Sequence, residues 1–197
     1  MMKTINYYNK NALDFVTSTK NVDFNTIQIK FSEKLPRGAY ILDFGCGSGR
    51  DTKYFLSQGY RVDAMDGSEE ICRLASEYTG IPVRHMLFQE LAVSDIYDGI
   101  WACSSILHLP YDELKKVLIR MSHALKENGI VYTSFKYGIF EGERNGRYFT
   151  DMTEKKLDRL LDKTPGFRVE EQWISTDVRP GREDENWLNI ILRKNGM

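Results

Sequence analysis

The fold is decided by an apolar run that ends in a glycine cluster, Ile41-Leu42-Asp43-Phe44-Gly45-Cys46-Gly47-Ser48-Gly49. The run has the length and composition of a buried strand, and residues 50–58 after it have the pattern of a helix. Glycines at alternate positions between a strand and a helix let the chain turn sharply and bring bare backbone close to a ligand. The stretch therefore predicts a ligand-binding turn. A tight turn that binds nothing is the alternative interpretation.

Strand and helix patterns alternate along the rest of the chain. Further strands are predicted at 61–65, 83–88, 99–103, 130–135, 168–175 and 187–193, and helices at 7–15, 24–35, 68–79, 114–125 and 153–163. This alternation predicts an α/β fold with a seven-stranded, mostly parallel sheet and helices on both faces. Only a loop joins the final two strands, so the last strand is expected to be antiparallel. Residues 138–152 form the longest irregular stretch.

Length, charge and cysteine usage exclude several classes of protein. The chain has 197 residues and a formal net charge of −1, without the basic excess of a protein that grips a nucleic-acid backbone. No metal-ligand spacing exists, so no metal is expected and the three cysteines are predicted to be reduced. The sequence also lacks a membrane span and a signal peptide. We therefore expect one cytoplasmic domain, 1–197, with a helical lid or extension (1–36) and a core (38–197).

An acidic residue ends the second predicted strand. Asp66 follows Gly45 by about 20 residues, where an acid can accept both hydroxyls of a ribose. An exposed acid at the start of the next helix is the alternative. A dinucleotide site fits less well, because Arg50 stands where that fingerprint has Gly or Ala. The chain also lacks the G-K-[ST] sequence of P-loop nucleotide hydrolases.

Four motifs in order resemble those of the class I S-adenosylmethionine-dependent methyltransferases. They are the run quoted above, Val62-Asp63-Ala64-Met65-Asp66-Gly67-Ser68, Tyr97-Asp98-Gly99-Ile100-Trp101-Ala102 with Ile106-Leu107-His108, and Leu125-Lys126-Glu127-Asn128-Gly129-Ile130-Val131. The likeness covers residues 38–136, and the final strands by topology. It implies a Rossmann-like fold, S-adenosylmethionine as the cofactor and methyltransferase activity. Where the family usually has Lys-Pro-Gly-Gly, residues 126–129 depart from it.

The resemblance also implies where the cofactor binds. The glycine loop would wrap its methionine portion, and Asp43 would face its amino group. Asp66 would take the ribose, and Glu90 the adenine amino group, although a solvated surface acid is the alternative for Glu90. The implied cofactor-binding residues are Asp43, Gly45, Cys46, Gly47, Gly49, Asp66, Gly67, Ser68, Gln89, Glu90, Leu91, Ala102, Cys103 and Ser104.

Methyl transfer needs a base only when the nucleophile must lose a proton. The candidates are His108, at the rim of the fourth strand, with Tyr8 and Tyr137; the predicted catalytic residues are His108 and Tyr8. Packing roles are the alternative for both. An Asn/Asp-Pro-Pro-Tyr motif, which resembling enzymes use on DNA bases, is missing after the fourth strand.

The acceptor is accordingly expected to be a small molecule. Residues 138–152 and 177–186 are predicted to cap the pocket, with Arg147, Arg179 and Arg182 holding an anionic acceptor. Solvated surface charge is the alternative for these arginines. An NAD-dependent oxidoreductase and a non-catalytic S-adenosylmethionine-binding protein remain the other functional hypotheses. The chain is expected to be a monomer or a homodimer.

Overall fold

The computed structural model describes residues 2–179, 181–182 and 184–196. The helices are α1 (Met2–Lys10), α2 (Ala12–Thr19), α3 (Asn25–Ser32), α4 (Arg50–Ser57), α5 (Glu69–Thr79), α6 (Tyr111–Ala124) and α7 (Glu154–Asp162), with short 3-10 helices η1 (Phe88–Glu90) and η2 (Ile106–His108). The strands are β1 (Tyr40–Phe44), β2 (Arg61–Asp66), β3 (Val83–His85), β4 (Tyr97–Ala102), β5 (Leu125–Lys136), β6 (Glu141–Arg144), β7 (Arg147–Thr150), β8 (Phe167–Thr176) and β9 (Asn186–Lys194).

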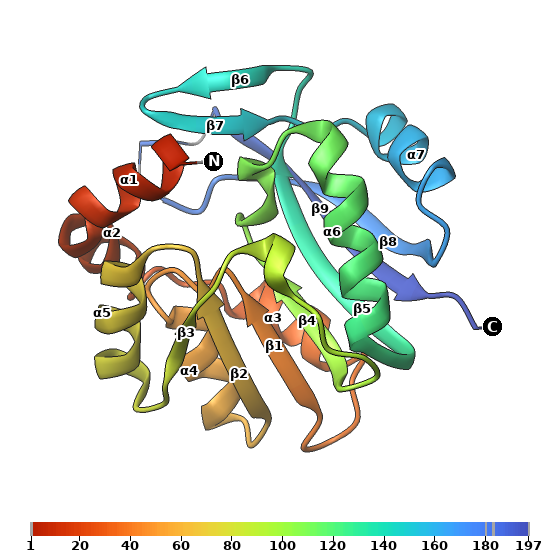
Figure 1. Ribbon diagram of the computed structural model, residues 1–197, viewed down its shortest axis with the longest axis horizontal. Helices are drawn as coiled ribbons and strands as arrows, with labels where there is room; N and C mark the ends of the chain where they lie inside the picture. The colour runs from red at the N-terminus through yellow and green to blue at the C-terminus, as the bar shows by residue number, and fades with distance from the viewer. Residues whose placement is uncertain (1, 180, 183, 197) are drawn as a thin grey trace.

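Seven strands form one sheet in the order β3-β2-β1-β4-β5-β9-β8 (Figure 1). Strands β1 to β5 pair in parallel, whereas β9 is antiparallel to both β5 and β8. The predicted α/β fold, with a mostly parallel sheet and an antiparallel last strand, is therefore confirmed. The strand order reverses between β1 and β4, and in such sheets ligands bind at the carboxyl ends of the strands beside that reversal.

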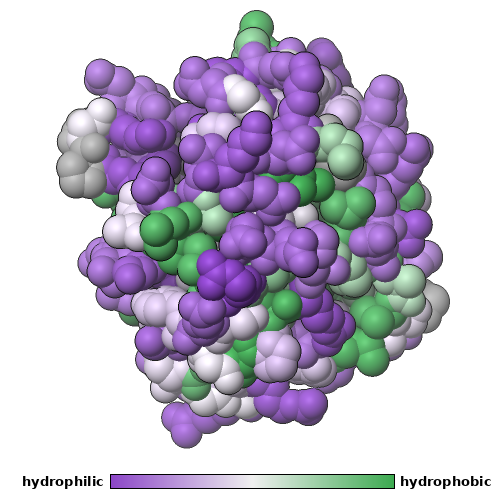
Figure 2. All heavy atoms as spheres, turned by 60° about the vertical axis from the view of Figure 1, so that its left-hand side comes forward, coloured by the Kyte–Doolittle hydropathy of each residue, from purple (hydrophilic) through white to green (hydrophobic). Residues whose placement is uncertain are grey.

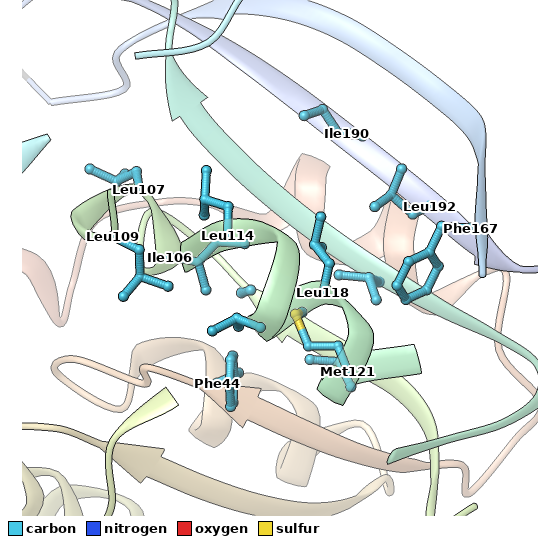
Figure 3. Packing of buried hydrophobic residues seen from close by; sticks show 14 of the residues in the cluster. Phe44, Ile106, Leu107, Leu109, Leu114, Leu118, Met121, Phe167, Ile190 and Leu192 are labelled. Carbon is cyan, nitrogen blue, oxygen red and sulfur yellow. The ribbon is translucent and has the colours of Figure 1, made fainter. Parts of the chain in front are cut away.

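Helices cover both faces of the sheet because the central strands are apolar on both sides. On one face, Leu114, Leu118 and Met121 of α6 pack against strand residues that include Phe44 and Ile190 (Figure 3). On the other face, Phe31 of α3 and Phe55 of α4 pack against Trp101 of β4. This two-sided core fixes the strand ends that carry the site.

Two local predictions were wrong. Residues 138–152, expected to be irregular, contain the β6–β7 hairpin, whose turn residues Asn145 and Gly146 have φ of 52° and 76°. Two residues with positive φ are what a two-residue hairpin turn requires. The helix expected at 7–15 is two helices, α1 and α2, that meet at Asn11. In Figure 1, α1 lies beside β7 at the end of the sheet where β5 meets the hairpin.

Leu118→Ala is expected to lower the free energy of unfolding by about 2–5 kcal/mol, because it leaves a cavity in the layer between α6 and the sheet. Urea denaturation followed by circular dichroism measures this change. Lys115→Ala, on the exposed side of the same helix, is the control and should change the value by less than about 0.5 kcal/mol. Equal effects of the two substitutions would contradict the packing described here.

Candidate active site

A cavity of about 230 Å³ lies where β1, β2, β4 and β5 end. Its floor comes from the glycine loop and from the segments that follow β2, β3 and β4. Its roof comes from the N-terminal helices, from β7 and from the loop between β8 and β9. Both segments predicted to cap the pocket thus contribute lining residues, namely Arg147, Phe149, Asp177, Val178, Arg179 and Arg182. Residues 180 and 183 lie outside the described residues.

The glycine loop turns through left-handed conformations. Gly45, Gly47 and Gly49 have φ of 86°, 55° and 77°. A Cβ on Gly45 would lie 2.5 Å from Cβ of Ser105, and one on Gly47 would lie 3.2 Å from the Phe15 ring. Gly45, Cys46 and Gly47 line the cavity. Gly49 does not line the cavity. Its bare Cα instead lets the start of α4 approach α5, since a Cβ at this position would lie 2.6 Å from Thr79.

Asp66 ties the glycine loop to the start of α5. Its carboxylate accepts hydrogen bonds from the backbone nitrogens of Gly47 (3.1 Å) and Ser68 (2.9 Å). The side chain is half-buried, so the alternative of an exposed acid is wrong. Burial raises the pKa of Asp66, while the backbone hydrogen bonds oppose the shift. Asp66, Gly67 and Ser68 all line the cavity.

Two further acidic residues, Asp43 and Asp51, lie beneath the loop. Asp43 is 1% exposed, accepts from the Thr52 hydroxyl and lies outside the cavity wall. Burial, and then the charge of Asp51, raises the pKa of Asp43 to about 8. Asp51 does line the cavity, and it accepts from Gln28 (2.6 Å) and Trp101 (2.8 Å). Sequence reasoning missed Asp51, because both partners are distant in sequence.

Arg50 continues this buried network. Its guanidinium donates twice to Asp51, at 2.8 and 2.9 Å, and covers the Phe24 ring with 4.4 Å to the ring centroid. Nη2 of Arg50 also donates to Sγ of Cys103, at 3.9 Å. Burial raises the pKa of the Cys103 thiol to about 12, so the thiol is protonated at neutral pH.

The segment after β3 differs from the predicted adenine site. Gln89, Glu90 and Leu91 lie outside the cavity wall, and Leu87 and Phe88 occupy it. The Glu90 carboxylate accepts from the backbone nitrogen of Leu87 at 2.6 Å. After β4, Cys103 and Ser104 reach the cavity and the buried Ala102 does not. The wall of the cavity is therefore more apolar on the β3 side than the sequence suggested.

His108 and Tyr8 meet across the roof. The Tyr8 hydroxyl and Nε2 of His108 are 2.9 Å apart, and Nδ1 of His108 lies 2.6 Å from the carbonyl oxygen of Tyr148. A carbonyl only accepts, so Nδ1 carries the proton and Nε2 accepts from Tyr8. Burial lowers the pKa of His108 to about 4, and burial raises that of Tyr8. Both side chains are therefore neutral at neutral pH. Tyr137 lies elsewhere and donates to Glu154.

The three predicted arginines all line the cavity but differ in their partners. The Arg179 guanidinium donates two hydrogen bonds to Asp177. Burial by itself raises the pKa of Asp177, but the contact with Arg179 outweighs burial and lowers this pKa to about 2. Arg182 lies 3.7 Å from Glu185, which also pairs with Lys136. Arg147 has no ion pair within the described part of the chain.

The chain is similar to known methyltransferases. Residues 41–129 match a family described as a methyltransferase domain. A crystal structure of Burkholderia thailandensis 1,6-didemethyltoxoflavin-N1-methyltransferase, with bound 1,6-didemethyltoxoflavin and S-adenosylhomocysteine, superposes with a TM-score of 0.79. It is 25% identical, and the match covers 98% of this chain and 87% of that one. These matches support the predicted resemblance to the class I enzymes, and the chain is an S-adenosylmethionine-dependent methyltransferase. Its cofactor is S-adenosylmethionine.

This methyltransferase is also similar to other proteins. An uncharacterized methyltransferase of Staphylococcus carnosus is 24% identical over 72% of this chain and 74% of its own length. Magnesium protoporphyrin IX methyltransferase from Synechocystis, with bound S-adenosylmethionine, has a TM-score of 0.72 at 15% identity, covering 96% of this chain and 94% of that one; it shares the fold. The chain spans less than two thirds of the length of two further curated relatives.

The described residues of this methyltransferase contain neither a membrane-spanning helix nor a cluster of metal ligands. Within 2–179, 181–182 and 184–196, no helix has the length and apolar character needed to cross a bilayer. Over the same residues, no three His, Cys, Asp or Glu side chains gather in a way that could bind a metal ion.

The pKa of His108 makes the stability of the methyltransferase depend on pH. Between the ordinary histidine value of 6.5 and about 4, the unfolded chain binds a proton at His108 that the folded chain does not. Stability is therefore expected to fall as the pH drops through this interval. His108→Gln should lose less stability than the wild type over the interval in urea denaturation. The exposed His123 supplies the control, because His123→Gln should follow the wild type. An NMR titration of His108 with a midpoint at or above 6.5 would contradict this assignment.

Proposed function

We propose that this methyltransferase acts on a small molecule that binds within the cavity. The observation that carries the proposal is the roof, because α1, β7 and the loop 177–186 all contribute lining residues above the strand ends. Small-molecule sites are concave and bury most of their ligand. The face turned forward in Figure 2 is mostly hydrophilic, with small and separate hydrophobic areas. The toxoflavin precursor named for the Burkholderia enzyme is itself a small molecule.

The residues around the glycine loop fit the cofactor. The positions a Cβ would fill at Gly45 and Gly47 are already crowded by Ser105 and Phe15, so only bare backbone can form this turn. An ionised carboxylate offers about four acceptor sites, and the backbone uses two of those of Asp66. We assign the ribose to the remaining acceptor sites of Asp66. The side chains of Leu87 and Phe88 suit the flat, apolar faces of the adenine.

The proposed acceptor half lies on the β4, β5 and β9 side of the cavity. Its polar groups come from Ser104, Ser134 and Asn189, and its aromatic groups from Phe149 and Trp187. Lys136 and the predicted substrate-binding residues Arg147, Arg179 and Arg182 surround this half. Arg179 and Arg182 are partly neutralised by their acidic partners, so we assign them to shaping this wall.

S-adenosylmethionine supplies an electrophilic methyl group on a sulfonium. The chain's own contribution is to hold the acceptor in line and to exclude water. We propose that Tyr8 and His108 remove a proton where the acceptor must lose one. Nε2 of His108 is unprotonated at neutral pH and already accepts from Tyr8 (2.9 Å), so a proton can pass through the hydroxyl to the imidazole.

Asp66→Asn is expected to weaken S-adenosylhomocysteine binding by about 1.5–3 kcal/mol, the range for hydrogen bonds to a charged group. Titration calorimetry measures the affinity. Some loss of stability should accompany it, because Asp66 also accepts from two backbone nitrogens. Glu69→Gln, on the exposed first turn of α5, is the control and should bind like the wild type. Unchanged affinity in Asp66→Asn would refute the ribose assignment.

The acceptor class can be tested with cell extract. The protein is incubated with S-adenosylmethionine and separate fractions of small molecules, nucleic acids and proteins, and the formation of S-adenosylhomocysteine is measured. We expect turnover with the small-molecule fraction, because the cavity lies beneath a roof. Turnover confined to a macromolecular fraction would overturn the proposal. Tight cofactor binding without turnover in any fraction would instead favour a non-catalytic binding protein.

A further inference from the structure

The cations of the cavity wall differ in how far their charge is compensated. Arg50 pairs with Asp51, Arg179 with Asp177, and Lys136 and Arg182 both with Glu185. Arg147 is the exception, because no carboxylate of a described residue lies within ion-pair distance of it. Among the described residues nothing therefore compensates its charge, which faces the proposed acceptor half.

The donors of Arg147 are also largely unused. A guanidinium carries five N–H donors, but the structure gives Arg147 one hydrogen bond, a long one of 3.4 Å from Nη1 to the Tyr8 hydroxyl. Its Nε is buried without a hydrogen-bond partner among the described residues. Leaving a charged donor unsatisfied costs free energy, so such a group is poised for a ligand.

Aromatic rings hold the guanidinium in place. Its central carbon lies 4.7 Å from the centroid of the Tyr7 ring and 5.2 Å from that of Phe149. These contacts stabilise the cation without occupying its in-plane donors, which remain available to an anion. Tyr7 belongs to α1 and Phe149 to β7, so the two roof elements fix the guanidinium from different sides.

We infer that the methyl acceptor is an organic anion whose carboxylate, or a similarly compact planar oxyanion, binds Arg147. This inference rests on the proposed function and narrows its substrate class. A carboxylate can accept two parallel hydrogen bonds from a guanidinium, which sets orientation as well as affinity. Phe149 then lies beside the acceptor's apolar part, and Tyr8, within reach of Arg147, lies beside its polar part.

The charge of Arg147 also acts on the proposed base. Arg147 lies close enough to His108 for its charge to help lower the pKa of that histidine, after the larger effect of burial. An anion on Arg147 offsets this charge. Acceptor binding therefore favours proton uptake by the Tyr8–His108 pair, so that recognition and base strength are linked through one guanidinium.

The test compares matched acids and amides as probes. Calorimetry measures the binding of benzoate and benzamide, and of 2-naphthoate and 2-naphthamide, to the protein saturated with S-adenosylhomocysteine. In the wild type, at least one acid should bind about tenfold or more tightly than its amide, as expected for a charge-assisted pair. Arg147→Met keeps the side-chain stem and should abolish the preference, whereas Arg147→Lys should retain part of it.

Arg144→Met is the matched control from the same hairpin. Arg144 also covers the Phe149 ring but is already paired with Asp151, and it lies outside the cavity wall. The acid preference should survive in this variant. Equal binding of acid and amide in the wild type, no binding of either, or a preference that survives Arg147→Met would overturn the anion assignment alone. Failure of S-adenosylhomocysteine to bind the wild type would overturn the proposed function itself.

Discussion

The close approach of three strand ends is the constraint on which the site depends. The backbone nitrogens of Gly45 and Cys46 both donate to the carbonyl oxygen of Met65 at 2.9 Å, which binds the turn after β1 to the end of β2. The Ser105 hydroxyl donates to the carbonyl oxygen of Phe44 at 2.6 Å, which binds the same turn to the segment after β4. A side chain at position 45 would separate these elements. The glycine there is thus required by packing as much as by any ligand.

The N-terminal helices belong to the site rather than merely preceding it. The Thr4 hydroxyl accepts from the backbone nitrogen of Tyr148 at 2.9 Å, which joins α1 to the hairpin. The Ser68 hydroxyl donates to the Asn9 side chain at 2.6 Å, which joins α1 to the start of α5. Tyr8 lies between these two attachments and reaches His108. Removal of α1 would therefore remove part of the cavity wall and one member of the Tyr8–His108 pair.

Local sequence patterns were enough for the sheet, the glycine loop and the position of Asp66, because each depends on neighbours in the chain. The hairpin is also encoded locally, because Asn145-Gly146 is a pair typical of two-residue hairpin turns. Other features depend on residues far apart. Asp51 meets Gln28 and Trp101 only after folding. The different states of Arg147 and Arg179 could not be predicted either, because each depends on which carboxylates the folded chain brings near.

The two sides of the cavity differ in which charged group is left without a partner of opposite charge. Around the glycine loop, Asp51 is paired with Arg50, whereas Asp66 accepts only from backbone nitrogens. In the roof, Arg147 has no carboxylate partner among the described residues, whereas Lys136 and Arg182 are paired with Glu185. Such an arrangement places an acidic group on the side of the cationic donor and a free cation on the side of an anionic acceptor. In the proposed reaction the sulfonium loses its positive charge and the nucleophilic atom gives its proton to the Tyr8–His108 pair, whereas the carboxylate on Arg147 keeps its charge. The transfer therefore removes the attraction between the donor and the acids around the glycine loop, but the methylated product keeps its attraction to Arg147.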